Sequence, residues 1–204
     1  MINAKSMRFN SFQKIMDTIP FLRIETPRLL MRSLQLQDAQ GMYAYRSDPR
    51  VTRYQRWRPV KEEEVEAFIL KYGNGSIDVV DSWCQLGVYR KTTQELIGDV
   101  GMHFLPPDAQ QVELGFTISP RHQRQGYAAE AVDALLSYLF GYLNKHRIIA
   151  SVDPRNTASV ALLEKLGMRK EAHHIQSVWT PEGWVDDMIY AVLREEWENT
   201  SGKG

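Results

Sequence analysis

Hydrophobic residues recur along this chain at two different periods, and the change of period predicts where helices give way to strands. Residues 28–34 form a short apolar run that is typical of a strand. Helical spacing follows in residues 38–46, where Asp38 stands at the position of a helix cap, and again in residues 61–72. The first of these helices must end before Pro49, because proline disfavours helical geometry in the residue that precedes it.

From residue 83 onward, stretches of period two dominate, and two further helices interrupt them. A short turn at Thr92-Thr93 joins two strands into a hairpin, and Gly167 ends the last helix. The predicted strands cover residues 83–91, 95–104, 112–118, 148–153, 174–180 and 185–193, and the predicted helices cover residues 128–144 and 157–166. This order of elements predicts an α/β fold with a mixed sheet.

The length of 204 residues suits one domain with an N-terminal arm. Pro20 and Pro27 bracket a short connector, so we expect the arm in residues 1–23 and the domain in residues 24–204. The arm carries apolar residues at helical spacing: Phe9, Phe12, Ile15, Met16 and Ile19. We therefore expect an extra helix that packs on the domain or on a second subunit of a homodimer. A helix lying on a membrane surface is the alternative.

Composition narrows the class of protein. The 25 basic and 25 acidic side chains give a formal net charge of zero, whereas nucleic-acid binders usually carry a basic excess, so we expect no nucleic-acid partner. Cys84 is the single cysteine, which excludes a disulfide within the chain and a thiolate zinc site. The five histidines show no ligand spacing, so we expect no metal. No apolar run approaches the roughly 20 residues that span a bilayer. A cytoplasmic protein fits these features best.

The stretch from residue 112 to residue 131, VELGFTISPRHQRQGYAAEA, is the most informative. Val112, Leu114, Phe116 and Ile118 alternate onto one face of a strand. A turn with one glycine, Gly126, follows, and the chain then enters an amphipathic helix. The first helical turn leaves about four N–H groups without partners at the positive end of the helix dipole. A strand, a glycine turn and a helix therefore make an anion site, although a single glycine equally suits a plain tight turn.

The spacing Gln123-x-x-Gly126-x-Ala128 after such a strand resembles the Arg/Gln-x-x-Gly-x-Gly/Ala signature of the GNAT superfamily of N-acetyltransferases. In that family the turn holds the pyrophosphate of acetyl-CoA on backbone N–H groups. Residues 148–167 resemble the family's next motif, which is a strand, then Asn156 at the head of a helix, then EKLG at its end. The opening ETPRLLMRSL and the closing GWVDDMIYAVLREEW resemble the branch that includes the ribosomal-protein N-terminal (alanine) acetyltransferases.

This resemblance spans residues 24–197 and implies a GNAT-like fold, with a mixed, mostly antiparallel sheet flanked by helices. It implies an acetyl-CoA-dependent N-acetyltransferase, with acetyl-CoA as cosubstrate, an amine as acceptor and no metal. The residues expected to contact CoA are Phe116, Ile118, Gln123, Arg124, Gln125, Gly126, Tyr127, Ala128, Asn156 and Ser159. Asn156 is also well placed to cap its helix, and the two roles are compatible.

The catalytic residues are less plainly marked. Strand alternation places Glu113 opposite the apolar stripe, which makes it the candidate general base. Backbone N–H groups of strand 112–118 would stabilise the acyl oxygen, with Gly115 permitting close approach. Many GNAT enzymes carry a tyrosine acid where this chain has Leu163, so Ser159 is the candidate that protonates the leaving thiolate and Tyr190 is the reserve.

Direct attack of the amine on the thioester is expected, because Cys84 has no base at readable spacing and suits a packing role. The attacking amine must be neutral. An α-amine with a pKa near 8 is about one tenth neutral at pH 7, whereas a lysine amine is neutral only about once in a few thousand. An α-amine therefore suits a site with one base better.

The acceptor itself stays open between a protein N-terminus, a small-molecule amine and an antibiotic. We expect loops 46–60, 106–111 and 179–184 to choose it. Three tryptophans either line an acceptor groove or simply pack: Trp57, Trp179 and Trp184. A CoA-binding sensor without turnover and a nucleotide-phosphate binder are the alternative functions.

Overall fold

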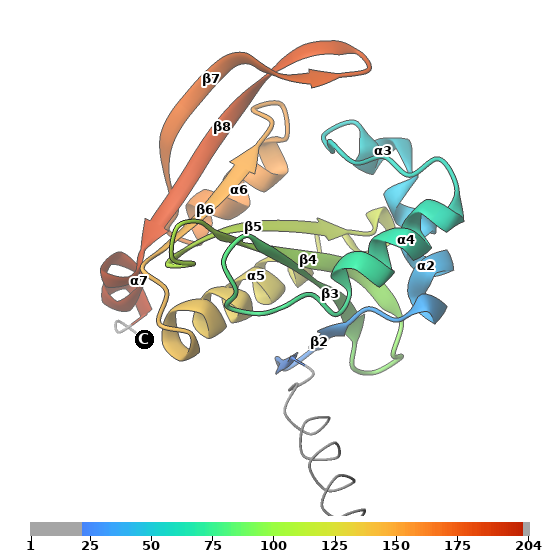
Figure 1. Cartoon of the computed structure of the whole chain (residues 1–204), viewed down its shortest axis with the longest axis horizontal. Coiled ribbons are helices and arrows are strands. Elements are labelled where there is room, and N and C mark those ends of the chain that lie inside the picture. Colours follow the sequence, from blue (N-terminus) through green and yellow to red (C-terminus); the bar gives the residue numbers. More distant parts are fainter. Residues whose placement is uncertain (1–21, 202–204) are drawn as a thin grey trace, which may run out of the picture.

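The computed structural model describes residues 22–201, and a single sheet organises them (Figure 1). Its strand order is β1-β2-β3-β4-β5-β6-β8-β7. Neighbouring strands are antiparallel except β5 and β6, which run parallel. The strands are β1 (Arg23–Glu25), β2 (Leu29–Ser33), β3 (Ser82–Arg90), β4 (Leu96–Leu105), β5 (Gln111–Ile118), β6 (Arg147–Val152), β7 (Arg169–Thr180) and β8 (Gly183–Leu193). The mixed, mostly antiparallel α/β sheet expected from the sequence is confirmed.

Every predicted strand is present, and the two departures have a physical reason. Strand β1 was not predicted, because three residues are too short to establish a period; it pairs with β2 at the edge of the sheet. Strand β7 begins at Arg169 rather than at residue 174. Most of its side chains are exposed, so no apolar alternation marks its beginning.

Helices cover both faces of the sheet. Helix α5 (Tyr127–Ser137) packs with β1, β2 and β5 and contributes Val132 and Leu135 to the main core. Helix α2 (Ala39–Arg46) lies on the other face, where the Tyr45 hydroxyl donates to Asp99 of β4 at 2.6 Å. Asp99 and its core neighbour Val100 point to opposite faces of the strand. Helix α4 (Glu62–Tyr72) packs against α2 in a smaller core of its own.

The remaining helical segments are α3 (Pro49–Thr52), α6 (Thr157–Lys165), α7 (Arg194–Ser201), the 3-10 turns Leu36–Asp38 and Pro120–His122, and the π-helical turn Tyr138–Tyr142. The helix predicted over residues 128–144 is therefore α5 followed by a π turn. Helix α7 was not predicted, because REEWENTS has a single apolar residue and no stripe. Asp38 does not cap α2 with its side chain; its carboxylate instead accepts from the Gln35 N–H at 2.8 Å.

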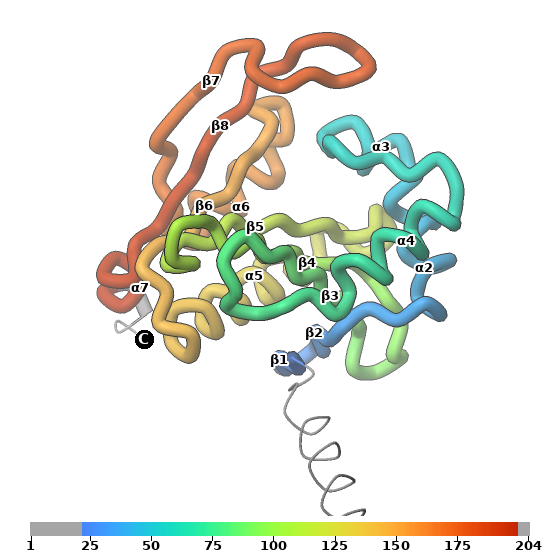
Figure 2. Tube along the Cα trace, viewed as in Figure 1, coloured from blue at the N-terminus to red at the C-terminus, as the bar shows by residue number. Residues whose placement is uncertain are grey.

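The hairpin of β7 and β8 extends beyond the rest of the sheet, toward the segment that follows α3 (Figure 2). An ion pair of 2.5 Å between Arg58 and Glu182 joins the two. No helix in the described part of the chain is long and apolar enough to cross a membrane. The helical arm and the homodimer that it would allow concern residues outside the described ones, and these stay predictions, as does the cytoplasmic location.

Candidate functional site

Strands β5 and β6 are paired over only three residues, although both continue beyond the pairing. Residues 111–113 face residues 147–149. Strand β5 then runs on to Ile118 and β6 to Val152 without further pairing to each other, while β5 stays paired with β4 over its whole length. Past Glu113 the edge of β5 that faces β6 is therefore open.

The turn after β5 presents backbone N–H groups at the end of this opening. Gly126 has a φ of 80°, in the left-handed region that favours glycine, and it directly precedes α5. The N–H of Glu130 donates to the Gly126 carbonyl, so the N–H groups of residues 127–129 have no partner within the helix. The Gln123 Nε2 donates to the Ile118 carbonyl at 2.9 Å and ties the turn to the end of the strand.

Arg28, in the segment before β2, contacts this turn and stabilises it. Its Nη1 donates to the Gln125 carbonyl at 2.9 Å, and its guanidinium lies 4.6 Å from the Tyr127 ring centre. The Glu130 carboxylate accepts from the Arg28 N–H at 2.9 Å and from the Thr26 hydroxyl at 2.5 Å. The opening segment of the domain thus holds the N-terminus of α5 in place.

A cavity of about 490 Å³ lies against this turn and the first turn of α6. Cationic side chains line it and no carboxylate does: Arg50, Arg124, Arg155 and Lys165. The buried Nδ1 of His122, which also lines the cavity, has no hydrogen-bond partner among the described residues. We call this the basic cavity. Cationic side chains, free N–H groups and a glycine that leaves the backbone bare fit the phosphates of CoA.

Most of the residues predicted to contact CoA line the basic cavity: Phe116, Ile118, Gln123, Arg124, Gly126, Tyr127, Ala128, Asn156 and Ser159. Gln125 does not. Its side chain turns back and donates from Nε2 to the Arg121 carbonyl at 3.1 Å. The sequence missed Arg50, Arg155 and Lys165, because they belong to other elements and no spacing links them to the turn.

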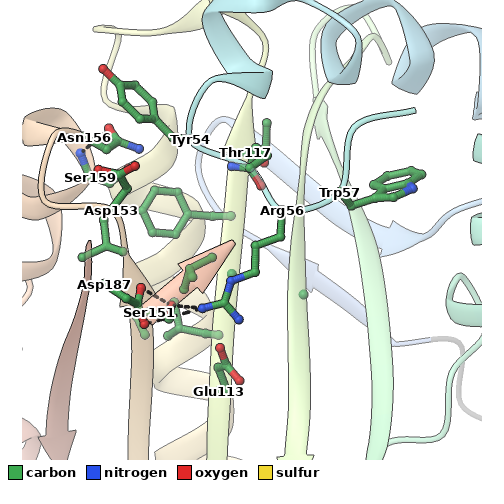
Figure 3. A pocket seen from close by; sticks show the side chains of 18 of the residues that line it. Tyr54, Arg56, Trp57, Glu113, Thr117, Ser151, Asp153, Asn156, Ser159 and Asp187 are labelled. Carbon is green, nitrogen blue, oxygen red and sulfur yellow. Dashed lines mark hydrogen bonds and ion pairs between the residues drawn. The ribbon is translucent and has the colours of Figure 1, made fainter. Parts of the chain in front are cut away.

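A second cavity of about 430 Å³ adjoins the first and is lined by aromatic side chains and by charges of both signs (Figure 3). Its carboxylates are Glu113, Asp153, Asp186 and Asp187. Its arginines are Arg46, Arg53, Arg56 and Arg58. We call it the mixed cavity.

The register of the sheet brings the polar residues of this cavity onto one face. Glu113 is opposite Ile149 of β6, so its side chain shares a face with Ile149 and with Ser151, two residues further. Ser151 is opposite Ile189 of β8, two residues from Asp187. Glu113, Ser151 and Asp187 therefore all line the mixed cavity, each from a different strand, as Figure 3 shows.

Two glycines keep this face of the sheet bare. Gln85, Gly101 and Gly115 lie side by side across β3, β4 and β5. A Cβ on Gly115 would meet nothing within 4 Å, so the space above it is open. A Cβ on Gly101 would lie 2.6 Å from Oε1 of Gln85. The Gln85 amide in turn donates to the fully buried Asp99, which fixes one wall of the cavity.

The two cavities meet at a junction lined by residues common to both: Tyr54, Gln55, Phe116, Thr117, Asn156 and Ser159. Asn156 is the N-cap of α6, as predicted, and its Oδ1 accepts from the Ser159 N–H at 3.3 Å. The buried Thr117 hydroxyl has no hydrogen-bond partner among the described residues. A molecule that extends from one cavity to the other has its middle at this junction.

Tyr190 lies apart from Glu113 and Ser159. It is 2% exposed, lines neither cavity, and donates its hydroxyl to Glu164 at 2.9 Å. Burial and this hydrogen bond raise the pKa of Tyr190. Cys84 is also buried, and burial raises the pKa of its thiol to about 11, which disfavours a reactive thiolate.

The three loops predicted to choose the acceptor differ in whether they line the cavities. Trp57 lines the mixed cavity and stacks on Phe68 at 4.2 Å. Trp179 and Trp184 line neither cavity; they are exposed and contact each other at the end of the β7–β8 hairpin. Loop 106–111 lines neither cavity. Within residues 22–201, no three side chains of the kinds that bind metals converge.

Known proteins are similar to this chain in sequence and in fold. The Acetyltransferase (GNAT) domain matches residues 28–169. N-acetyltransferase YnaD of Bacillus subtilis, itself uncharacterised, is 33% identical over 176 residues, which cover 86% of this chain and 99% of that protein. The crystal structure of a GNAT-family acetyltransferase from Bacillus anthracis has a TM-score of 0.76 at 30% identity and covers 85% of this chain and 99% of its own. The ribosomal protein uS5-alanine N-acetyltransferase of Escherichia coli is 25% identical, over 89% of this chain and 95% of that one.

The match to the GNAT domain, on a fold with a glycine turn beside an open strand edge and two adjoining cavities, identifies an acyltransferase that uses a CoA thioester. The chain belongs to the GNAT acetyltransferase family and is an acetyl-CoA-dependent N-acetyltransferase.

Proposed function

We propose that this enzyme moves the acetyl group of acetyl-CoA to the α-amine of its acceptor by direct attack within a ternary complex. The junction between the two cavities is the observation that carries the proposal. The basic cavity offers phosphates the free N–H groups of residues 127–129 and four cationic side chains. Two of these cations, Arg50 and Arg155, also pair with carboxylates outside this cavity. The acceptor then occupies the mixed cavity, and Phe116, Thr117 and Ser159 line the place where the reacting groups meet.

Glu113 is the general base in this proposal. Its carboxylate lines the mixed cavity, and no hydrogen bond or ion pair joins it to another described residue. A carboxylate without a partner can take a proton from an incoming ammonium, directly or through water. Deprotonating an α-amine at pH 7 costs about 3 kcal/mol less than deprotonating a lysine amine. One weak base therefore suits an α-amine.

Ser159 is the proposed acid for the departing thiolate. It stands on the first turn of α6, is half-buried, and lines both cavities. Tyr190 is less suited to this role, because its hydroxyl is buried and already donates to Glu164. Cys84 lines neither cavity, which agrees with attack by the amine rather than by an enzyme thiol.

A protein N-terminus is the acceptor that we favour. The uS5-alanine N-acetyltransferase of Escherichia coli, whose name specifies such an acceptor, aligns over nearly the whole chain. Arg58 and Glu182 form an ion pair at the rim that faces solvent. Because exposed ion pairs of this kind contribute only about 0–1 kcal/mol, a peptide tail can displace this one. A small-molecule amine or an antibiotic is the alternative acceptor.

The test is a pH–rate profile of wild type and Glu113→Gln with one N-terminal peptide as acceptor. We expect kcat/KM to fall by about 10²-fold near neutral pH, in line with the contribution of a general base. The loss should shrink as the pH rises toward the pKa of the amine, because the free amine then needs no base. Affinity for CoA should not change.

Glu66→Gln is the matched control, because it removes the same charge from an exposed position on α4. A loss that stays constant across pH would give Glu113 a structural or orienting role instead. If CoA binds but no acceptor in a broad amine panel releases free thiol, the chain is a CoA-binding sensor. If ATP displaces CoA at equal concentration in a thermal-shift assay, the result favours the alternative that the chain binds nucleotide phosphates.

A further inference from the structure

Arg56 reaches into the mixed cavity and pairs with groups on the opposite wall (Figure 3). Its Nη2 lies 3.5 Å from the Asp187 carboxylate and donates to the Ser151 hydroxyl at 3.2 Å. The Ser151 hydroxyl donates to Asp187 at 2.7 Å. Arg56 comes from the segment between α3 and α4, whereas Ser151 lies on β6 and Asp187 on β8, so this contact crosses the cavity.

The two partners differ sharply in their surroundings. Asp187 is buried on the wall of the cavity, and a buried carboxylate requires a cationic or hydrogen-bonding partner. Its partners among the described residues are one neutral hydroxyl and the Arg56 guanidinium. The Arg56 side chain is 63% exposed and its segment is not held in a helix or strand, so the arginine can leave at little cost. The carboxylate is a fixed part of the site, and the cation is replaceable.

Glu113 and Asp187 come from different levels of the sheet. Glu113 is opposite Ile149 of β6, and Ile149 is opposite Ala191 of β8. Asp187 lies four residues from Ala191 along β8. At about 3.3 Å per residue the two backbone positions are offset by roughly 13 Å along the sheet, before the reach of the side chains is counted. Arg56 pairs with Asp187 and not with Glu113, whose carboxylate has no partner among the described residues. The cavity therefore offers places for two positive charges.

We infer that Arg56 stands in for a cationic group of the acceptor, and that the preferred acceptor carries a second positive charge besides the amine near Glu113. The acceptor's second cation displaces Arg56 and takes its place against Asp187 and Ser151. Arg56 then competes with the acceptor in the free enzyme, while Asp187 determines specificity. This inference rests on the proposed function, since it places the acceptor in the mixed cavity.

Arginine amide and citrulline amide test the inference, because they share the α-amine and the chain length and differ in the charge of the side chain. We expect wild type to prefer arginine amide by about 10-fold or more in kcat/KM, the effect of one charge-assisted hydrogen bond. Asp187→Asn should reduce this preference to nearly none, chiefly by raising KM for arginine amide. The rate with citrulline amide should change little.

If Arg56 stands in for the acceptor's cation, Arg56→Gln should strengthen binding of arginine amide, whereas Asp187→Asn weakens it. KM for arginine amide should fall by about 2- to 5-fold with kcat unchanged, because the exposed ion pair is weak. In an Asp187→Asn background the same change should have no effect on KM. Arg23→Gln is the matched control: it removes the same charge from an exposed arginine whose partner is Glu25, and Arg23 lines neither cavity.

Three outcomes would overturn the inference. A rise in KM on replacing Arg56 would make it a direct contact to the acceptor. A preference for arginine amide that survives Asp187→Asn would place the second cation elsewhere. Equal loss with both amides in Asp187→Asn, at unchanged CoA affinity and melting temperature, would give Asp187 a part in the chemistry. The Glu113→Gln pH profile is independent of all three, so failure here is distinguishable from failure of the proposed function.

Discussion

The basic cavity and the mixed cavity adjoin each other but are built in different ways. The basic cavity uses backbone N–H groups, one glycine in the left-handed region and four cations with no carboxylate. The mixed cavity uses side chains of both signs that the register of the sheet brings together from distant segments. The first suits the anionic CoA that GNAT enzymes use. The second is made by a combination of residues that a few substitutions would change.

The largest effect that should separate the two cavities comes from Gly126. Gly126→Val forces a β-branched residue into a φ of 80° and puts its Cβ 3.3 Å from Nη2 of Arg28, so it distorts the turn that presents the free N–H groups of α5. Loss of two hydrogen bonds to phosphate should weaken CoA binding by about 10³-fold in a calorimetric titration. Gly167→Val is the control, since Gly167 has a φ of 81°, open space around it and no part in either cavity. Both variants should lose similar stability, and equal CoA affinity in the two would remove the turn from the cofactor site.

Gly115 provides the corresponding change in the mixed cavity. Gly115→Val meets nothing within 4 Å, suits a strand, and fills the open space above the sheet. We expect kcat/KM for the acceptor to fall by about 10²-fold, because a displaced amine no longer reaches the thioester. Steady-state kinetics against CoA titration decides the point. If CoA affinity falls as much as acceptor turnover, the two cavities are not separate sites.

Ser159 lies at the junction and should report on both cavities. Ser159→Ala should lower kcat by about 10-fold and leave CoA affinity within about 2-fold, because a thiolate with a pKa near 8.5 needs only modest help to leave. Rapid-quench and equilibrium measurements on the same preparation separate the two effects. A change in CoA affinity alone would make Ser159 a ligand contact and reopen the question of the acid.

The smallest effect concerns the charge of the basic cavity. Lys165→Gln should weaken CoA binding by about 3-fold at low salt, and by less as salt increases, because an exposed cation acts on phosphate through solvent. Lys61→Gln, exposed at the start of α4 and absent from both cavities, is the control. Equal sensitivity to salt in the two variants would show that the cavity does not concentrate the charge.

The comparison also explains which parts of the molecule could be predicted. The turn around Gly126 is local: the strand before it, the glycine and the helix after it follow one another in the sequence, so pattern and spacing suffice. Strands with a buried and an open face were predicted for the same reason. Helix α7 and strand β1 carry no such pattern and were missed.

The mixed cavity could not be predicted in the same way. Ser151 and Asp187 are 36 residues apart and meet only because β6 and β8 are neighbours with Ser151 opposite Ile189. Arg56 comes from a segment with no regular structure, so no period places it. Glu113 was identified from alternation within its own strand, which is a local property. Tyr190 was chosen by its residue type alone, and its partner Glu164 lies on a different element.

The short pairing of β5 with β6 links ligand binding to the stability of the folded enzyme. A strand edge that lacks its neighbour leaves backbone groups facing solvent, and a ligand that lies along this edge supplies some of the missing contacts. Binding to the folded form only, at 100 times the dissociation constant, adds about 2.7 kcal/mol to the free energy of unfolding, so the unfolded fraction falls about 100-fold. We therefore expect saturating acetyl-CoA to slow proteolysis of the purified enzyme as well as to supply its reaction.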